Sequence, residues 1–280
     1  MEAKISVVMS VYKENTVQLK RSIYSILEQT FWDFEFLIIL DDPENLEAHD
    51  YILKIQKRDK RIIFLKNWIN KWLPYSLNKA VQIWKWDYIV RMDADDYSYN
   101  TRIERQYEYF LNNPKTDLLF TWWREIDEKG CNLIRLPKAK YFSNIKKYFF
   151  TKSIILHPTM MCKRQILIDN PYPVVWRPED FILFIRLIHK QYSFHIVWEV
   201  LFDYTIQNYD YDVKYMKLKW YTENYIPYLF SQVPNFYLNI YFHIYILRII
   251  FEYLMTRNKS LFIYWYMNIY KILKKNWNEK

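Results

Sequence analysis

The sequence predicts an α/β fold with a mostly parallel, Rossmann-like central sheet flanked by helices and followed by a helical C-terminal region. Short β-branched runs alternate with helical patterns through the first half of the chain. Such alternation favours a parallel sheet, because each parallel pair needs a crossover connection over one face. The chain has 280 residues, 51% of them hydrophobic, which is enough for a large core.

The expected elements follow in order along the chain. The strands are Ile5–Val11, Phe34–Leu40, Ile62–Leu65, Tyr88–Met92 and Asp117–Trp123. The first helix begins after the cap residues Asn15 and Thr16. The later helices are Leu46–Gln56, Pro74–Trp84 and Thr101–Leu111. Ligands of such sheets bind at the carboxyl ends of the strands, so these ends predict the functional site.

Beyond the fifth strand the pattern becomes less regular. Gly130 follows Asp127-Glu128-Lys129 and predicts a hairpin turn. From about Ile206 the chain is rich in aromatic residues and reads as helical. We therefore expect three parts along the chain, at 1–125, 126–206 and 207–280, the last of them basic, aromatic and helical.

The composition excludes two phosphate-binding motifs. Gly130 is the single glycine of the chain, whereas a dinucleotide-binding loop needs three glycines and a Walker A loop needs two. A bound phosphate must then be held by a metal, by side chains or by helix N-termini. The two cysteines, Cys131 and Cys162, show no metal-ligand spacing.

The net charge of +9 is concentrated toward the C-terminus. Residues 207–280 hold ten Lys/Arg and five Asp/Glu, which gives +5 on the last quarter. A basic, aromatic segment suits an anionic membrane surface or carrier, and an ordinary solvated basic face explains the charge equally well. We expect no nucleic-acid partner, because no dense basic cluster occurs. No signal peptide or run of 18 apolar residues is found, so we expect a cytoplasmic protein.

Acidic residues occur at the ends of strands or in loops at three places. These are Asp41-Asp42, Asp93-Ala94-Asp95-Asp96 and Glu179-Asp180. Carboxylates at such short spacing raise each other's pKa unless a cation offsets the repulsion. The second cluster therefore predicts Mg²⁺ or Mn²⁺ bridging a diphosphate. An acidic turn is the plain alternative, and a calcium loop is disfavoured because Ser98 stands where that loop needs glycine.

Five stretches of the sequence together carry a family resemblance. They are ISVVMSVYKEN at 5–15, SILEQTFWDFEFLIILDD at 25–42, YIVRMDADDYSYNTRIERQ at 88–106, HPTMMCKR at 157–164 and RPEDFILFIRL at 177–187. These stretches resemble the family 2 glycosyltransferases with the GT-A fold, especially bacterial enzymes of surface-polysaccharide and lipooligosaccharide assembly. They occur in the family's order and cover roughly residues 4–205. The resemblance implies the GT-A fold and transfer of a sugar from a nucleotide-sugar donor, with a nucleotide-sugar-binding half at 1–125 and an acceptor-binding half with the catalytic base at 126–206.

The resemblance also implies a role for each matching position. Ser10 and Tyr12 would line the base pocket, and Asp42 would bond the base edge. Asp93 would face the ribose, and Asp95 with Asp96 would hold the metal. Asp180 would be the catalytic base. His157 and Glu179 would lie on the acceptor side, although a structural loop histidine and a helix N-terminal acidic pair explain these two residues as well.

Two departures from the family pattern concern the nucleotide. Many similar enzymes carry Arg-Gly before the helix that precedes the acidic cluster, and the corresponding stretch here is Asn70-Lys71-Trp72-Leu73-Pro74. Lys71 would replace the arginine as a phosphate contact, as a point charge rather than a bidentate fork. Pro43-Glu44 replaces the usual Gly-Ser after Asp42. UDP is expected from family frequency alone.

The resulting hypothesis is an inverting, metal-dependent glycosyltransferase that acts on a glycan or a lipid-linked acceptor. Residues 225–277 would contact the inner membrane, or else pack on the catalytic domain or in a homo-oligomer. A sugar nucleotidyltransferase is disfavoured, because its glycine-rich loop is missing. The alternative outside enzymes is an inactive scaffold that kept the fold and binds a membrane or a partner enzyme.

Overall fold

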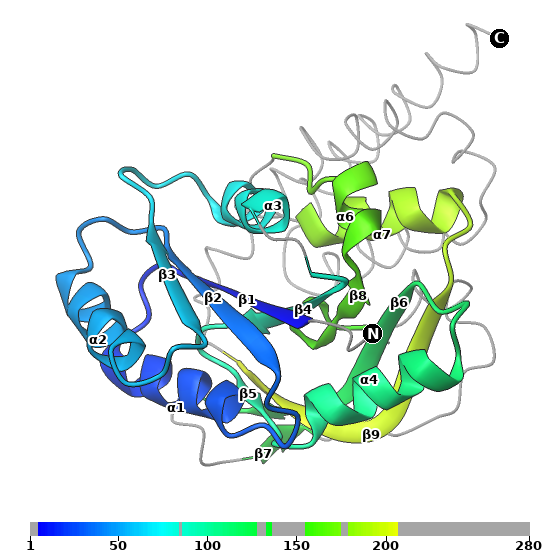
Figure 1. Ribbon diagram of the computed structural model, residues 1–280, viewed down its shortest axis with the longest axis horizontal. Helices are drawn as coiled ribbons and strands as arrows, with labels where there is room; N and C mark the ends of the chain where they lie inside the picture. Colours follow the sequence, from blue (N-terminus) through cyan, green and yellow to red (C-terminus); the bar gives the residue numbers. More distant parts are fainter. Residues whose placement is uncertain (1–4, 84–85, 128–132, 136–154, 175–178, 207–280) are drawn as a thin grey trace, which may run out of the picture. The chain divides into compact units, whose positions relative to one another are not determined.

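The computed structural model describes residues 5–83, 86–127, 133–135, 155–174 and 179–206. All of them belong to one compact unit. They build a nine-stranded sheet in the order β3-β2-β1-β4-β8-β6-β9-β5, with β7 paired to β6 (Figure 1). The helical region predicted for residues 207–280 lies outside the described residues.

The first half of the sheet is parallel, as predicted. It contains β1 (Ile5–Val11), β2 (Phe34–Leu40), β3 (Ile62–Lys66) and β4 (Tyr88–Asp93). Strand β1 lies between β2 and β4, and β3 is the edge strand beyond β2. Every residue of β1 except Ser10 is buried, which explains its run of apolar residues: strands covered on both faces lose the alternation of polar and apolar side chains.

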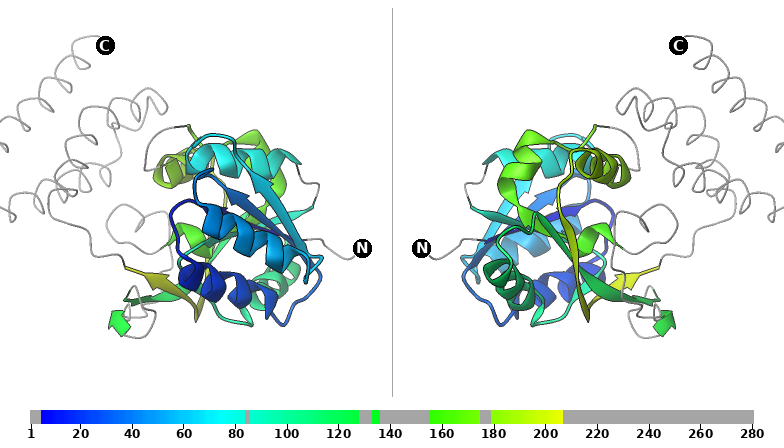
Figure 2. Two further views of the ribbon diagram at one scale, coloured as in Figure 1. Left: turned by 90° about the vertical axis from the view of Figure 1, so that its left-hand side faces the viewer. Right: turned by 90° about the vertical axis from the view of Figure 1, so that its right-hand side faces the viewer.

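The first-half helices also agree with the prediction. They are α1 (Thr16–Leu27), α2 (Leu46–Gln56), α3 (Leu73–Ile83) and α4 (Arg102–Asn112). Asn15 caps α1: its side chain accepts the N–H of Gln18 at 3.0 Å, and the Gln18 side chain accepts the N–H of Asn15 at 3.0 Å. Right-handed crossovers place α1 and α2 on one face of the sheet and α3 on the other (Figure 2).

The second half is mixed and was only partly predicted. It contains β5 (Tyr97–Ser98), β6 (Leu118–Ile126), β7 (Leu133–Arg135), the 3-10 turn η1 (His157–Thr159), β8 (Met161–Lys163), α6 (Arg164–Asp169), α7 (Glu179–His189) and β9 (Phe194–Thr205). Strand β8 is antiparallel to both β4 and β6, and so joins the two halves. Ile126 pairs with Leu133 across the predicted hairpin, whose turn at Gly130 lies outside the described residues.

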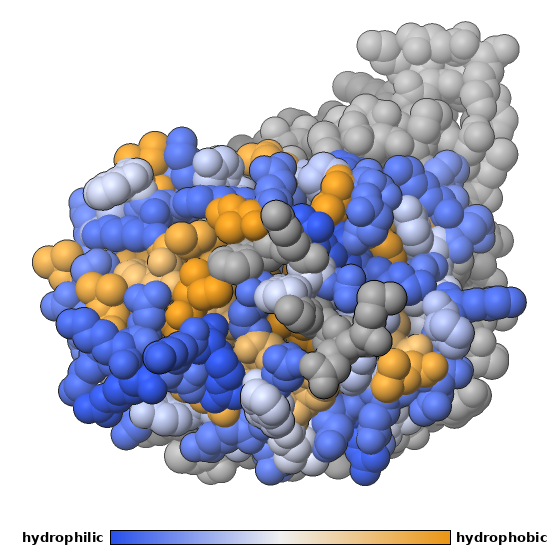
Figure 3. All heavy atoms as spheres, viewed as in Figure 1, coloured by the Kyte–Doolittle hydropathy of each residue, from blue (hydrophilic) through white to orange (hydrophobic). Residues whose placement is uncertain are grey.

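The core lies between the sheet and its two helical layers, with residues 36–40 of β2 fully buried. Toward the edge of the sheet, Ile63, Phe64 and Leu65 of β3 are only half-buried. Apolar surface gathers over β2 and β3 and is framed by polar side chains (Figure 3). In the part of the chain that the structure describes, no helix is both long enough and apolar enough to cross a membrane.

Candidate active site

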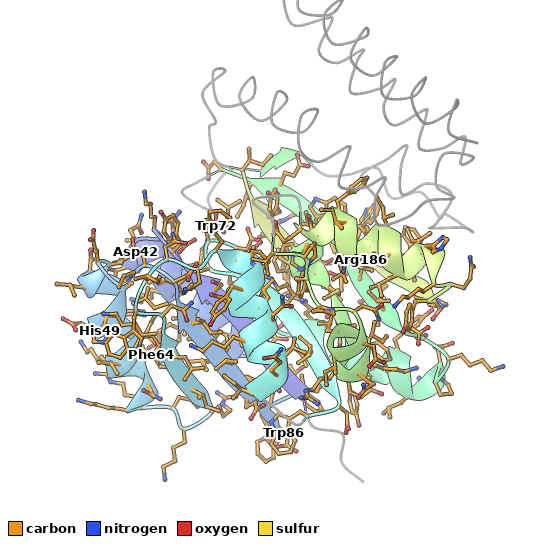
Figure 4. The ribbon with its side chains drawn as sticks, turned by 90° about the horizontal axis from the view of Figure 1, so that it is seen from above. Asp42, His49, Phe64, Trp72, Trp86 and Arg186 are labelled. Carbon is orange, nitrogen blue, oxygen red and sulfur yellow. The ribbon has the colours of Figure 1, made fainter. Side chains whose placement is uncertain are left out.

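The carboxyl ends of the parallel strands bring the first group of predicted residues to one edge of the sheet. Ser10 of β1 pairs in register with Asp93 of β4 and with Ile39 of β2, and Asp42 follows β2 two residues after its end. Asp42 and Trp72 lie toward this edge, whereas Trp86, which precedes β4, lies at the opposite one (Figure 4). The predicted base-binding positions are therefore neighbours in the fold.

A buried aspartate ties three of the strand ends together. The N–H of Asp41 donates to the carbonyl of Val11 at 2.7 Å. Its Oδ1 accepts the side-chain amide of Asn67 at 2.7 Å and the backbone N–H of Lys71 at 3.0 Å. Asp41 thus fixes the chain after β1, β2 and β3, while its neighbour Asp42 is half-buried at the surface.

The residues expected at the nucleotide base are accessible. Tyr12 is 42% exposed, and its carbonyl accepts the side-chain amide of Asn45 at 3.3 Å. Asp42 accepts the backbone N–H of Glu44 through Oδ1 at 3.0 Å, which orients its carboxylate. The Lys71 ammonium lies 5.7 Å from the centre of the Tyr75 ring. Tyr12 and Lys71 are exposed and Asp42 is half-buried, and all three lie in loops at the carboxyl ends of the strands, where binding residues are concentrated.

Side chains of helix α1 hold the backbone of the acidic turn that follows β4. Ser22 donates its hydroxyl to the carbonyl of Asp93 at 2.8 Å, and the guanidinium of Arg21 donates to the carbonyl of Asp95. Thr205, the last residue of β9, donates its hydroxyl to the same Asp95 carbonyl at 2.5 Å. The backbone of the turn is therefore fixed by α1 and β9, so the Asp93 and Asp95 side chains project from a rigid backbone.

Asp96 differs from its neighbours, because its carboxyl is fully buried. Its Oδ1 accepts the backbone N–H of Thr205 at 2.8 Å. Burial first, and then the charges of Asp95 and Asp93, raise the pKa of Asp96 well above its usual range. This position fits a role in joining the acidic turn to β9, and leaves Asp95 as the half-buried member of the predicted metal pair.

A buried arginine beside the cluster was not singled out from the sequence. Arg91 is 1% exposed, and its guanidinium forms an ion pair with Asp93 and donates to the carbonyl of Met92. A charged residue inside an apolar strand was the available signal, since buried charges are almost always paired. Arg91 therefore holds the carboxylate expected to face the ribose.

Glu14 is the second residue that the sequence analysis missed. Its carboxylate accepts the backbone N–H of Tyr12 at 2.6 Å. Burial first, and then the nearby charges of Asp95 and Asp93, raise the pKa of Glu14 to about 7. Glu14 comes three residues after β1 and stands between Lys13 and Asn15, with no acidic neighbour in the sequence to single it out. The shift identifies it as a further member of the acidic cluster.

Asp180 joins this cluster from the other half of the chain. It lies in the first turn of α7, and its Oδ1 accepts the N–H of Phe181 at 2.7 Å. Burial raises the pKa of Asp180, and the charge of Asp93 raises it further. The fold therefore brings Asp180 close enough to Asp93 for their charges to interact, although 87 positions separate them in the sequence.

The two residues expected on the acceptor side are buried. His157 is 6% exposed, and its Nε2 lies 2.9 Å from the hydroxyl of Tyr172. Burial, and then the charge of Arg91, lower the pKa of His157 well below its usual range, so the ring is neutral. Glu179 is 5% exposed. Their burial favours a supporting role for both, behind Asp180 rather than at the surface.

The donor groups of the site suit a hard divalent cation shared with a ligand. Within the described residues, no three His, Cys, Asp or Glu side chains form a group that could hold a metal by themselves. The mutual repulsion of Glu14, Asp93 and Asp95 is of the kind that a cation relieves. Mg²⁺ and Mn²⁺ sites of this type use one or two carboxylates and complete their shell with phosphate oxygens.

Comparison with known proteins identifies the class and then the family. An α/β sheet with acidic groups at the carboxyl ends of its parallel strands defines a ligand-binding class of α/β protein. The model of glycosyl transferase family 2 matches residues 6–170. The chain belongs to this family and is a glycosyltransferase.

Relatives support this assignment. The chain is 42% identical over 241 residues to an uncharacterized glycosyltransferase of Methanocaldococcus jannaschii, covering 85% of this chain and 83% of the relative. It is 32% identical over 209 residues to the O-antigen biosynthesis glycosyltransferase WbnJ of Escherichia coli, covering 73% of this chain and 80% of that relative.

Solved structures confirm the GT-A fold. The mannosyltransferase PcManGT from Pyrobaculum calidifontis, in complex with GDP-Man and Mn²⁺, matches with a TM-score of 0.63 at 12% identity, over 82% of this chain and 65% of its own. TarS 1-349 of S. aureus, in complex with UDP-GlcNAc, matches with a TM-score of 0.60 at 14% identity, over 83% and 67%. The chain spans about two thirds of these solved chains.

Proposed function

We propose that the protein transfers a sugar, with inversion, from a UDP-sugar to a hydroxyl of a glycan or lipid-linked acceptor, and that a divalent cation assists the transfer. The observation that carries the proposal is the coupling of Asp180 on α7 to Asp93 at the end of β4. Family membership defines the transferase chemistry, and the electrostatic interaction of these two carboxylates supports a base on α7 that acts beside the donor-binding acids.

In the proposed donor site, Ser10, Tyr12 and Asp42 receive the base, Lys71 reaches a phosphate, and Asp93 bonds the ribose. Asp95 would hold Mn²⁺ or Mg²⁺, which when bound neutralises the charge that develops on the leaving diphosphate. TarS binds UDP-GlcNAc, which favours UDP, and PcManGT binds GDP-Man with Mn²⁺, which favours manganese and keeps GDP as a nucleotide to be tested.

Asp180 is proposed as the general base. The acceptor hydroxyl must lose its proton as its oxygen attacks the anomeric carbon and the bond to the diphosphate breaks. A carboxylate with a raised pKa is a stronger base than an ordinary aspartate, which suits this proton transfer. His157 and Glu179 are proposed only to support the acceptor side, because both side chains are buried.

Thermal melting tests the donor site first. The wild type and Asp95→Asn are melted with UDP, GDP, CMP and dTDP, each with and without Mn²⁺. A nucleotide at about 100 times its dissociation constant stabilises the fold by about 2.7 kcal/mol, a shift that is readily measured. We expect a manganese-dependent shift with UDP that Asp95→Asn loses. If no nucleotide raises the melting temperature, with or without Mn²⁺, the result favours the inactive scaffold over the active transferase.

Asp180→Asn separates chemistry from donor binding. Without the base, turnover of the UDP-sugar should fall by about 10²–10⁴-fold, whereas the UDP-induced melting shift should stay. The measurement is release of UDP in the presence of an acceptor, with Asp169→Asn on α6 as the matched control. Full turnover by Asp180→Asn would exclude this residue as the base.

A further inference from the structure

The segment between β3 and α3 presents three large apolar side chains to solvent. Trp68 is 88% exposed, Ile69 57% and Trp72 49%, whereas the two tryptophans of β6, Trp122 and Trp123, are at most 3% exposed. Single exposed apolar residues are common on proteins, but several of them gathered in one short segment mark an interaction surface. The segment is therefore a candidate contact for a partner.

Hydrogen bonds at both ends of the segment make its middle part project. The buried side chain of Asn67 donates to Oδ1 of Asp41 at 2.7 Å, and the backbone N–H of Lys71 donates to the same oxygen at 3.0 Å. Residues 68–70 thus form a tip whose two ends are fixed at one carboxylate. The segment extends past the end of β3 before it turns back to α3 (Figure 1).

The backbone of Trp72 turns the chain from the tip back into α3. Its φ is +68°, in the left-handed region that is unfavourable for a bulky residue. Its N–H donates to Oδ1 of Asn70 at 2.9 Å, and its carbonyl accepts the N–H of Tyr75 at 3.1 Å. The surrounding contacts therefore enforce one shape of the segment, and a preformed shape reduces the entropy lost on binding.

The charge of the segment favours an anionic partner. Residues 60–86 contain six Lys or Arg residues and no Asp or Glu. Lys66 precedes the tip and Lys71 follows it, both within three positions of Trp68. The loop between β2 and α2 carries Asp42 and Glu44, so the excess of positive charge belongs to the β3–α3 segment itself.

The residue types favour a membrane over a protein partner. The cores of protein interfaces are enriched in Trp and depleted of Lys, and a stable interface uses about 20–30 residues on each side. Membrane-surface segments combine the two types, because indole rings lie at the level of the lipid headgroups while ammonium groups attract anionic lipids. A projecting tip of three residues with lysines on both sides matches the membrane pattern.

We propose that residues 68–70 insert Trp68 and Ile69 into the headgroup region of an anionic membrane, with Lys66 beside the lipid phosphates. Neither of the two inserted side chains belongs to the proposed donor site. The tip follows the carboxyl end of β3, and the candidate active site lies at the carboxyl ends of the same parallel strands. This contact therefore turns the active-site edge of the sheet toward the membrane.

The experiment is co-sedimentation of the full chain, without nucleotide, with vesicles that contain phosphatidylglycerol. Trp68→Ala combined with Ile69→Ala should bind the vesicles about ten-fold or more weakly than the wild type, because both inserted side chains are removed. The matched control combines Trp32→Ala with Leu111→Ala, at positions that are 72% and 61% exposed. Trp32 precedes β2 and so lies toward the amino ends of the parallel strands.

The control variant should bind vesicles as the wild type does. Equal binding by the two double variants would overturn the proposal, as would absence of vesicle binding by the wild type. Because this measurement contains no nucleotide, its result does not depend on whether the proposed function is correct.

Two further measurements on the Trp68 and Ile69 double variant identify other roles of the tip. Its melting temperature and its manganese-dependent shift with UDP should equal those of the wild type, because both side chains are exposed. Loss of the UDP shift would assign the tip to the donor site, and a marked drop in melting temperature would assign it to folding. Loss of a wild-type dimer, with unchanged vesicle binding, would assign it to a second copy of this chain. Each of these three results would overturn the membrane contact.

Discussion

The pKa of Glu14 reflects the excess of negative charge at the candidate site. Glu14 shares its surroundings with Asp93 and Asp95, and its carboxylate accepts the backbone N–H groups of Tyr12 and of Glu14 itself. Its pKa is raised from 4.5 to about 7, so the folded protein favours the protonated form. A cation at Asp95 would reverse this preference, because it stabilises nearby carboxylates.

This shift predicts a pH dependence of stability in the metal-free protein. Because the folded pKa of Glu14 lies above the unfolded one, its contribution is fully present below pH 4.5 and is lost as the pH rises to about 7. We expect Glu14→Gln to remove this part of the slope and to stabilise the fold at pH 8 by an amount on the order of 1–3 kcal/mol.

Urea unfolding at several pH values in the presence of a chelator measures the effect. Glu44→Gln, an exposed acid at the same edge, serves as the control and should change stability by less than about 0.5 kcal/mol. Parallel pH profiles for Glu14→Gln and the wild type would contradict the raised pKa.

At the scale of elements, helix α3 connects the donor half to the loop that precedes α7. The side-chain amide of Asn78 donates to the carbonyl of Tyr172 at 2.8 Å, and its oxygen accepts the N–H of Tyr172 at 2.8 Å. Tyr172 in turn bonds His157. This chain of contacts fixes Tyr172, which precedes Asp180 by eight positions, between α3 and η1.

Asn78→Ala should therefore destabilise the protein by about 2–3 kcal/mol, because it leaves two backbone groups of a buried residue without partners. Chemical denaturation measures the change. Asn113→Ala removes an exposed amide that donates to one carbonyl of its own helix, and should cost about 0.5 kcal/mol. An equal, small effect of both substitutions would show that the Asn78 contacts do not stabilise the fold.

Elements with a strong local pattern were predictable, and those that depend on distant contacts were not. Strands β1 and β2 and helix α2 begin and end where the sequence places them, because buried β-branched runs and capped amphipathic turns are local signals. Strand β9 was missed, although it has twelve residues, because its pairing with β6 is non-local and its register shifts twice.

The residues of the candidate site were likewise predictable only in part. The acidic turn is visible in the sequence as a run of carboxylates at a strand end, whereas Asp180 was proposed only through the resemblance to the family. The different roles of Asp95 and Asp96 were not predictable, because only the fold shows that β9 buries Asp96. Arg91 and Glu14 likewise depend on neighbours that the sequence does not place.

For the whole molecule, we propose that residues 225–277 contact an anionic membrane surface on the cytoplasmic side, where a lipid-linked acceptor would lie. These residues lie outside the described part of the chain, and the proposal rests on their aromatic and basic composition. The test is co-sedimentation of the full chain with vesicles that contain phosphatidylglycerol.

Each lysine near an anionic surface contributes about 1 kcal/mol, so replacing Lys271, Lys274 and Lys275 by glutamine should weaken vesicle binding by about ten-fold or more. The control replaces Lys54, Lys57 and Lys60, which are exposed at the end of α2 and just beyond it, and changes the net charge equally. Binding should also fall with added salt, because screening weakens surface electrostatics. Equal binding by the two triple variants would contradict a membrane role for the C-terminal lysines and would attribute any attraction to net charge alone.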